Sequence, residues 1–285
     1  MYLITSQEIL DRFIPNVLAS VKGEKSLFDK LAPAIELAEK WVAETFLGPT
    51  LLVSLANPHD TSVIKSFTCR IITAEAFKNS CPSLDLILTP NGFGIVNNSN
   101  VVPASRERVD KLIESLEMER DRAIHLLLSS LPSIPDWLNT AHCRRFASTM
   151  FPTLDVVDSL GINFPKWRKY TELRPIIEDI ELMIETQYIG HEQMEVFRHE
   201  AMTKSSSSTL VSNIIRSLKA CEVQLIKDKL SPDPALLPIP STLTNIVNII
   251  RLHPSEFLEW HNSTIASLYK PVIYENKKGD KAYWF

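Results

Sequence analysis

Two stretches of the chain repeat one helix pattern at a constant spacing, and this repeat constrains the fold more than any other feature. Between residues 27 and 48, apolar residues recur three or four positions apart with charged residues between them, as in an amphipathic helix. Residues 173–190 share six identities with residues 31–48 over 18 ungapped positions. The identical residues are Leu31, Pro33, Ile35, Glu36, Glu39 and Gly48, matched by Leu173, Pro175, Ile177, Glu178, Glu181 and Gly190. Although helices reuse a few residue types, this agreement predicts two diverged copies of one helical unit.

Each half also contains a stretch with the pattern of a β-hairpin. Residues 84–96 place two short apolar strands around Asn91-Gly92, and Asn-Gly is a common hairpin turn. Residues 272–285 place two strand-like segments around a longer loop that contains Gly279. The sequence therefore predicts a mainly α (α+β) protein made of two related helical-bundle units, each with a short hairpin.

The remaining pattern places further helices and a boundary between the units. Apolar residues on one face predict a helix from residue 105 to 131, which Pro132 and Pro135 end. Further helices are predicted at 164–190, 209–230, 243–250 and 255–269, and four prolines predict an extended connector at 231–240. A chain of 285 residues exceeds the usual single-core size of about 100 to 150 residues. We expect a first unit at residues 1–135, with the hairpin near 84–96, and a second unit at 136–285 that ends in the hairpin near 272–285.

Composition excludes several classes of function. Charged residues make up 22% of the chain and the net charge is −4, which disfavours binding to nucleic acid or to an anionic membrane. The seven glycines form no phosphate-binding pattern such as G-x-x-x-x-G-K, so nucleotide folds of that kind are not expected. The four cysteines lie far apart without C-x-x-C spacing, which indicates reduced thiols. No secretion signal and no stretch of about 18 apolar residues is present, so we expect a cytoplasmic protein without a membrane span.

Two groups of residues could carry chemistry, but each has a simpler explanation. His191, Glu195 and His199 share one helix face and could bind zinc, yet neither His-Glu pair has the second histidine of an H-E-x-x-H motif. An exposed polar face explains them equally well. Cys143 follows His142 and could act as a nucleophile beside a base, but no motif such as G-x-S-x-G presents it. We therefore expect no enzyme, and no catalytic, cofactor-binding or metal-binding residue.

Two aromatic segments could contact a partner. Residues 166–170 alternate basic and aromatic side chains, as single-strand nucleic acid binders do, although acidic neighbours favour an ordinary solvated helix with its aromatic residues in the core. The other segment is Tyr283, Trp284 and Phe285. Three consecutive aromatic side chains are costly to leave in water, so they pack on the chain's own helices or contact a partner by strand addition.

Residues 85–96 and 100–109 resemble a signature shared by uncharacterised proteins of gut Bacteroidetes and their prophages, and residues 274–277 with the aromatic end resemble the same group. The helix that ends in an aromatic residue and a glycine is also similar to the helical head-tail connector proteins of tailed phages, which form rings beneath the portal. Connectors are usually much shorter, so a tandem chain departs from their pattern.

The resemblance implies a non-enzymatic protein for phage or prophage virion assembly, of head-tail connector or adaptor type, in the host cytoplasm or the virion. Its partners would be portal or tail proteins, or copies of itself. Two other classes stay open. One is a bacterial helical scaffold or regulatory binding protein, and the other is an enzyme whose site forms only in the fold.

Overall fold

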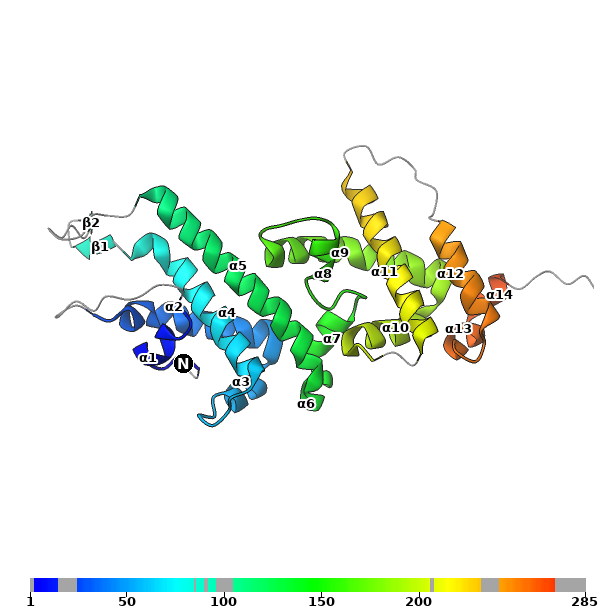
Figure 1. Cartoon of the computed structure of the whole chain (residues 1–285), viewed down its shortest axis with the longest axis horizontal. Helices are drawn as coiled ribbons and strands as arrows, with labels where there is room; N and C mark the ends of the chain where they lie inside the picture. Colours follow the sequence, from blue (N-terminus) through cyan, green and yellow to red (C-terminus); the bar gives the residue numbers. More distant parts are fainter. Residues whose placement is uncertain are drawn as a thin grey trace, which may run out of the picture. The chain divides into compact units, whose positions relative to one another are not determined.

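A computed structural model describes residues 3–14, 25–84, 86–89, 92–95, 105–205, 208–231 and 241–269. The chain is mainly helical (Figure 1) and divides into two compact units, Met1–Arg174 and Pro175–Phe285. No helix in the described ranges is both long enough and apolar enough to cross a membrane.

The first unit contains most of the helices and one pair of short strands. Its helical elements are α1 (Gln7–Asp11), α2 (Leu27–Val42), the π-helical turn η1 (Ala43–Leu47), α3 (Pro49–Leu55), α4 (Val63–Ser80), η2 (Cys81–Ser83), α5 (Arg106–Ser130), η3 (Leu131–Ser133), α6 (Pro135–Leu138), α7 (Ala141–Ala147), α8 (Asp155–Ser159) and the start of α9 (Lys166–Ile184). The strands β1 (Leu86–Thr89) and β2 (Gly92–Ile95) pair antiparallel, with Leu86 opposite Ile95.

Helix α4 forms the centre of the first unit, where it packs on both α2 and α5 (Figure 1). Nine of its 18 residues are buried, from Ile64 to Phe77, and they include three consecutive ones at Ile71, Ile72 and Thr73. A helix buried on several sides carries no single apolar stripe. This is why the periodicity of the sequence does not reveal α4, although it reveals α2 and α5.

An aromatic cluster holds the first turns of α9 in the first unit. The ring of Phe46 lies 5.0 Å from Trp167 and 5.9 Å from Phe146, and Trp167 stacks on Tyr170 at 5.8 Å. The hydroxyl of Tyr170 donates to the carbonyl oxygen of Phe151 at 2.9 Å. Because these contacts join residues on both sides of position 135, the first unit extends beyond the boundary expected there and includes α6, α7 and α8.

Helices are the only regular elements among the described residues of the second unit. It contains the rest of α9, the π-helical turn η4 (Glu185–Ile189), α10 (His191–Thr203), α11 (Thr209–Leu230), α12 (Ser241–Leu252), α13 (Leu258–Asn262) and α14 (Thr264–Leu268). The single helix expected at 255–269 is two short helices, because extended Ser263 ends the first and its hydroxyl caps the second. Residues 232–240 of the connector predicted at 231–240 lie outside the described residues, as does the hairpin predicted at 272–285.

In both units a long helix ends through a π-helical turn at a glycine. Gly48 has φ 79° and ψ 156°, and Gly190 has φ 83° and ψ 152°. Only glycine adopts this backbone region without strain. A Cβ atom on Gly48 would lie 3.2 Å from the His142 ring, and one on Gly190 would lie 3.2 Å from Ser263 Cβ. The glycine at the end of each repeated stretch is therefore required by both conformation and space.

In both units a buried tryptophan bonds to the backbone of the π-helical turn. The indole N–H of Trp137 donates to the carbonyl oxygen of Phe46 at 2.7 Å, and that of Trp260 donates to the carbonyl oxygen of Tyr188 at 2.9 Å. Each acceptor is the second residue before the glycine. Three residues after each tryptophan, a hydroxyl side chain caps the next short helix: Thr140 caps α7 and Ser263 caps α14.

Candidate functional site

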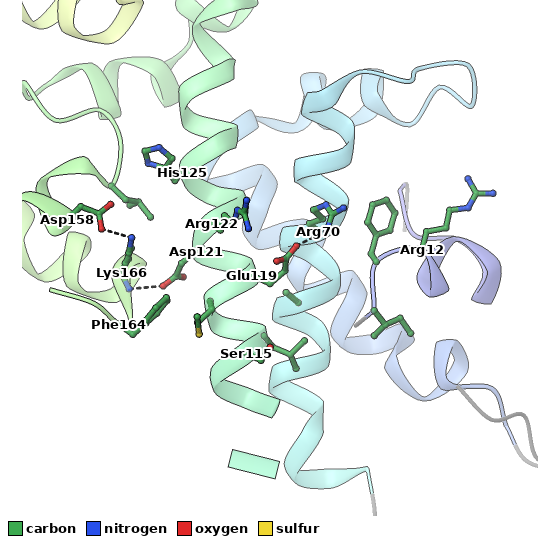
Figure 2. Close-up of a pocket in the computed structure, with 16 residues that line it drawn as sticks. Arg12, Arg70, Ser115, Glu119, Asp121, Arg122, His125, Asp158, Phe164 and Lys166 are labelled. Atoms are coloured by element: carbon green, nitrogen blue, oxygen red, sulfur yellow. Dashed lines mark hydrogen bonds and ion pairs between the residues drawn. The ribbon is translucent and has the colours of Figure 1, made fainter. Parts of the chain in front are cut away.

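The first unit contains an open pocket of about 570 Å³ along α5, called the α5 pocket here (Figure 2). Helix α5 lines it with residues three or four positions apart, so that they share one face. Residues of α4 and α8, the segment that follows α1, Phe164 and the first residue of α9 complete the lining. The lining includes Arg12, Arg70, Met118, Glu119, Asp121, Arg122, His125, Asp158, Phe164 and Lys166.

A buried ion network lies under the pocket. The guanidinium of Arg120 donates to Asp121 Oδ1 at 2.7 and 2.9 Å and to Glu75 Oε2 at 2.8 Å. Burial opposes the charge of Glu75, but the hydrogen bonds and charges of Arg120 and Lys78 outweigh it and lower the pKa of that carboxyl. The side chains of Arg120 and Asp121 are 6% and 0% exposed, so the network is part of the core.

Asp121 also fixes the start of α9. Its Oδ2 accepts the backbone N–H of Lys166 at 2.7 Å and that of Trp167 at 3.2 Å. The first N–H groups of a helix have no partner within the helix, and a carboxylate there also interacts favourably with the helix dipole. The two oxygens of the Asp121 carboxylate thus connect Arg120 in α5 to the first residues of α9, which lie beside the pocket.

Most charged groups of the pocket lining are already paired. Arg70 Nη1 lies 2.7 Å from Glu119 Oε1, and Lys166 pairs with Asp158. Arg122 is exposed, and its guanidinium has neither an ion pair nor a hydrogen bond among the described residues. Nδ1 of His125 is buried and forms no hydrogen bond there, since Asp155 lies 3.7 Å away. The described lining therefore offers the unpaired guanidinium of Arg122 to a ligand, whereas the Nδ1 atom of His125 is buried out of reach.

Apolar side chains lie beside these polar groups. Met118 is 48% exposed and Phe164 is 43% exposed, although both are large and apolar. Covering such side chains with apolar atoms is favourable, and exposed apolar groups that gather at one place indicate a contact site. The arrangement can bind an amphipathic group with a negative charge. The sequence did not predict this pocket, because the face of α5 that lines it mixes charged and apolar residues, as the solvated face of many helices does.

The second unit has its own ion network, on α9 and α10. Arg198 contacts Glu181 Oε2 at 3.0 Å, Glu185 Oε2 at 2.8 Å and Glu195 Oε1 at 2.7 Å. Nδ1 of His191 lies 2.7 Å from Glu185 Oε1, and this hydrogen bond raises the pKa of His191. Glu195 and His191, which were candidates for zinc ligands, thus take part in ion pairs. Among the described residues no group of three His, Cys, Asp or Glu side chains could hold a metal ion.

Glu222 is a further buried acid that the sequence analysis did not single out. It lies on α11, is fully buried, and neither carboxyl oxygen has a hydrogen-bond partner in the described structure. Burial raises its pKa well above the usual value, and the nearby charge of Glu181 raises it further. A signal was present, since Glu222 falls on the apolar stripe of α11 with Leu218 and Ile226.

The other described candidates from the sequence are buried, packed in the core or paired with neighbouring charges. Cys143 is 4% exposed, and burial raises the pKa of its thiol, so it remains protonated. In the described structure it shares no hydrogen bond with His142, whose ring instead lies against Gly48. Within residues 166–170, the aromatic rings pack in the core cluster, while Arg168 and Lys169 pair with Glu172. The predicted partner contact at Tyr283, Trp284 and Phe285 lies outside the described residues and stays a prediction.

Comparison with known proteins yields one match. Residues 14–147 match the model of a family of unknown function, DUF6712. The matched range includes all elements of the first unit from α2 to α7. No curated protein and no solved structure matches the chain. The segment from α2 to α7 is thus similar to a family of unknown function.

Proposed function

We propose that this chain is a non-enzymatic assembly protein that works through contacts with other proteins, as a head-tail connector or adaptor of a phage or prophage virion. The match to a family of unknown function is compatible with the uncharacterised group that the sequence resembles. The structural observation that carries the proposal is the matching order of local features in the two units, which supports a tandem duplication.

In this proposal the duplication extends over six consecutive helices in each copy. In the first, α2 with its π-helical turn leads through a glycine to α3, α4, α5, the tryptophan helix α6 and the capped helix α7. In the second, α9 with its π-helical turn leads through a glycine to α10, α11, α12, the tryptophan helix α13 and the capped helix α14. In this order the strands β1 and β2 correspond to the segment between α11 and α12, rather than to residues 272–285.

Duplicated units support an assembly role for a physical reason. Two copies of one scaffold present similar surfaces, so a partner that repeats in an assembly can contact each copy in a similar way. Each copy also holds its geometry by buried interactions, namely the tryptophan-to-carbonyl bonds and the ion networks around Arg120 and Arg198. A fixed scaffold with repeated surfaces suits a protein whose work is to position other proteins.

The experiment is to measure the mass of the full chain by light scattering coupled to size exclusion, over a range of concentrations. The chain is measured alone and with the portal protein encoded in the same genomic region. We expect a closed ring of many copies, either alone or on the portal. A monomer or dimer under all conditions would contradict the proposal and favour a regulatory binding protein.

A further inference from the structure

We propose that the α5 pocket is a docking site for a short segment of a partner protein that carries an apolar side chain next to a carboxylate. The inference rests on the proposed function, since it identifies one place where this chain contacts another protein. It is carried by two features that meet in the pocket, namely an unpaired guanidinium and exposed apolar side chains (Figure 2).

The carboxylate follows from the charges of the lining. The carboxylates of Glu119 and Asp158 already pair with Arg70 and Lys166, while the guanidinium of Arg122 has no partner among the described residues. An arginine fork binds a carboxylate through two parallel N–H donors, which gives both strength and direction. A carboxylate from a partner would thus find a donor pair at Arg122 that no acid of the described chain occupies.

The apolar part follows from the exposed side chains. Met118 lies on the same face of α5 as Arg122, one helical turn away, and Phe164 lines the pocket from the segment before α9. Both remain about half exposed in the chain alone. Methionine adapts its shape to different apolar partners, and an aromatic ring offers a large flat contact. An aliphatic or aromatic side chain of the partner would cover both.

The lining favours a protein segment over a polyanion. Four cationic side chains and three carboxylates line the pocket, which leaves a single positive charge in excess. Nucleic acid affinity grows with the number of phosphates that basic residues neutralise, and the three carboxylates would oppose each added phosphate. A single carboxylate beside an apolar group matches this balance.

The experiment is a selection of random displayed peptides on the full chain, followed by fluorescence anisotropy with the selected peptides. We expect the selected peptides to contain Asp or Glu next to a large apolar residue. Arg122→Glu should weaken their binding by about tenfold or more, the loss expected for a charge-assisted hydrogen bond. Met118→Gln should weaken it too. Arg108→Glu is the matched control, since Arg108 is exposed on the same helix outside the lining and its loss should leave binding unchanged.

Several outcomes would overturn the inference. They are a selection that enriches no peptide, equal binding by the Arg122→Glu variant, equal losses for Arg122→Glu and Arg108→Glu, or displacement of the peptides by heparin at low concentration. Arg122→Gln, which removes the charge without reversing it, and the melting temperature of each variant guard against misfolding. Mass measurement of Arg122→Glu separates the two proposals. Ring formation without peptide binding contradicts only the docking site, and peptide binding without any assembly contradicts only the proposed function.

Discussion

Glu222 should make the second unit less stable as the pH rises. Its carboxyl is fully buried on α11, and neither oxygen has a hydrogen-bond partner in the described structure. Burial is the largest cause of its raised pKa, and the charge of Glu181 adds to it. The positive charges of Lys219 and Arg198 lower the pKa, but by less. The folded chain therefore holds Glu222 in its neutral, protonated form.

The sign of the pH dependence follows from this proton. An unfolded chain releases the proton near the ordinary value of 4.5, whereas the folded chain keeps it to a higher pH. The contribution of Glu222 to the free energy of unfolding is therefore fully present below that ordinary value. It is lost as the pH rises towards the raised pKa of the folded state. The free energy of unfolding should fall by about 1.4 kcal/mol for each pH unit in this window. An unpartnered buried carboxyl adds a cost of about 1–3 kcal/mol.

Two substitutions separate these contributions. Glu222→Gln keeps the polar atoms but cannot titrate, so it should abolish the slope with pH. Glu222→Leu removes the polar atoms as well, and should add about 1–3 kcal/mol of stability at every pH. The assay is urea denaturation of the full chain between about pH 5 and 8. Hydrogen exchange of peptides from Thr209–Leu230 assigns the change to α11.

A second titrating group provides the control. The raised pKa of His191 means that its ion pair with Glu185 is also lost as the pH rises, although this exposed pair should contribute little. His191→Gln in both backgrounds removes that contribution. The predicted role of Glu222 would be refuted if Glu222→Gln kept the pH slope of the wild type. It would also be refuted if Glu222→Leu lowered the free energy of unfolding near neutral pH.

Three further predictions concern the shared scaffold and the ion network of the first unit. Trp137→Phe and Trp260→Phe should each cost about 1–3 kcal/mol by urea denaturation, since each leaves a backbone carbonyl without its donor, and a loss in only one unit would count against the duplication. Gly48→Ala and Gly190→Ala should each cost about 1–3 kcal/mol, seen as a lower melting temperature, because the backbone is strained for alanine; an unchanged melting temperature would contradict this. Asp121→Ala should cost about 3–5 kcal/mol, because the buried guanidinium of Arg120 keeps Glu75 but loses its more deeply buried carboxylate partner, and a calorimetric loss below about 1 kcal/mol would refute the role of the network.

Amphipathic helices were predictable because half of their surface faces water. The helix expected at 209–230 is α11, Thr209–Leu230, and the helix expected at 105–131 is α5, Arg106–Ser130. Each shows an apolar stripe because its other face is solvated. Helix α4 was not predicted, since burial on several sides replaces the stripe with a mixture of apolar and small residues. Sequence periodicity therefore reports which helices lie at the surface and is silent about the central one.

The α5 pocket was not predictable, because its lining joins four separate parts of the chain. No recognisable motif surrounds any of its four basic residues, which are Arg12, Arg70, Arg122 and Lys166. Their proximity depends on the packing of α4 on α5 and on the hydrogen bonds of Asp121 to the start of α9. A local pattern carries no signal for such long-range contacts.

The repeated glutamates show how far a sequence identity can be carried. Glu39 and Glu181 hold the same place in the two repeated stretches, and both are buried. Glu39 Oε1 accepts the backbone N–H groups of Leu3 and Ile4, whereas Glu181 pairs with Arg198. The position of the acid follows from the helix pattern, but its partner follows from what each unit packs against it. The same reasoning applies to the α5 pocket: two units can share a helix order and similar outer surfaces without sharing this pocket, so the binding of each unit must be tested separately.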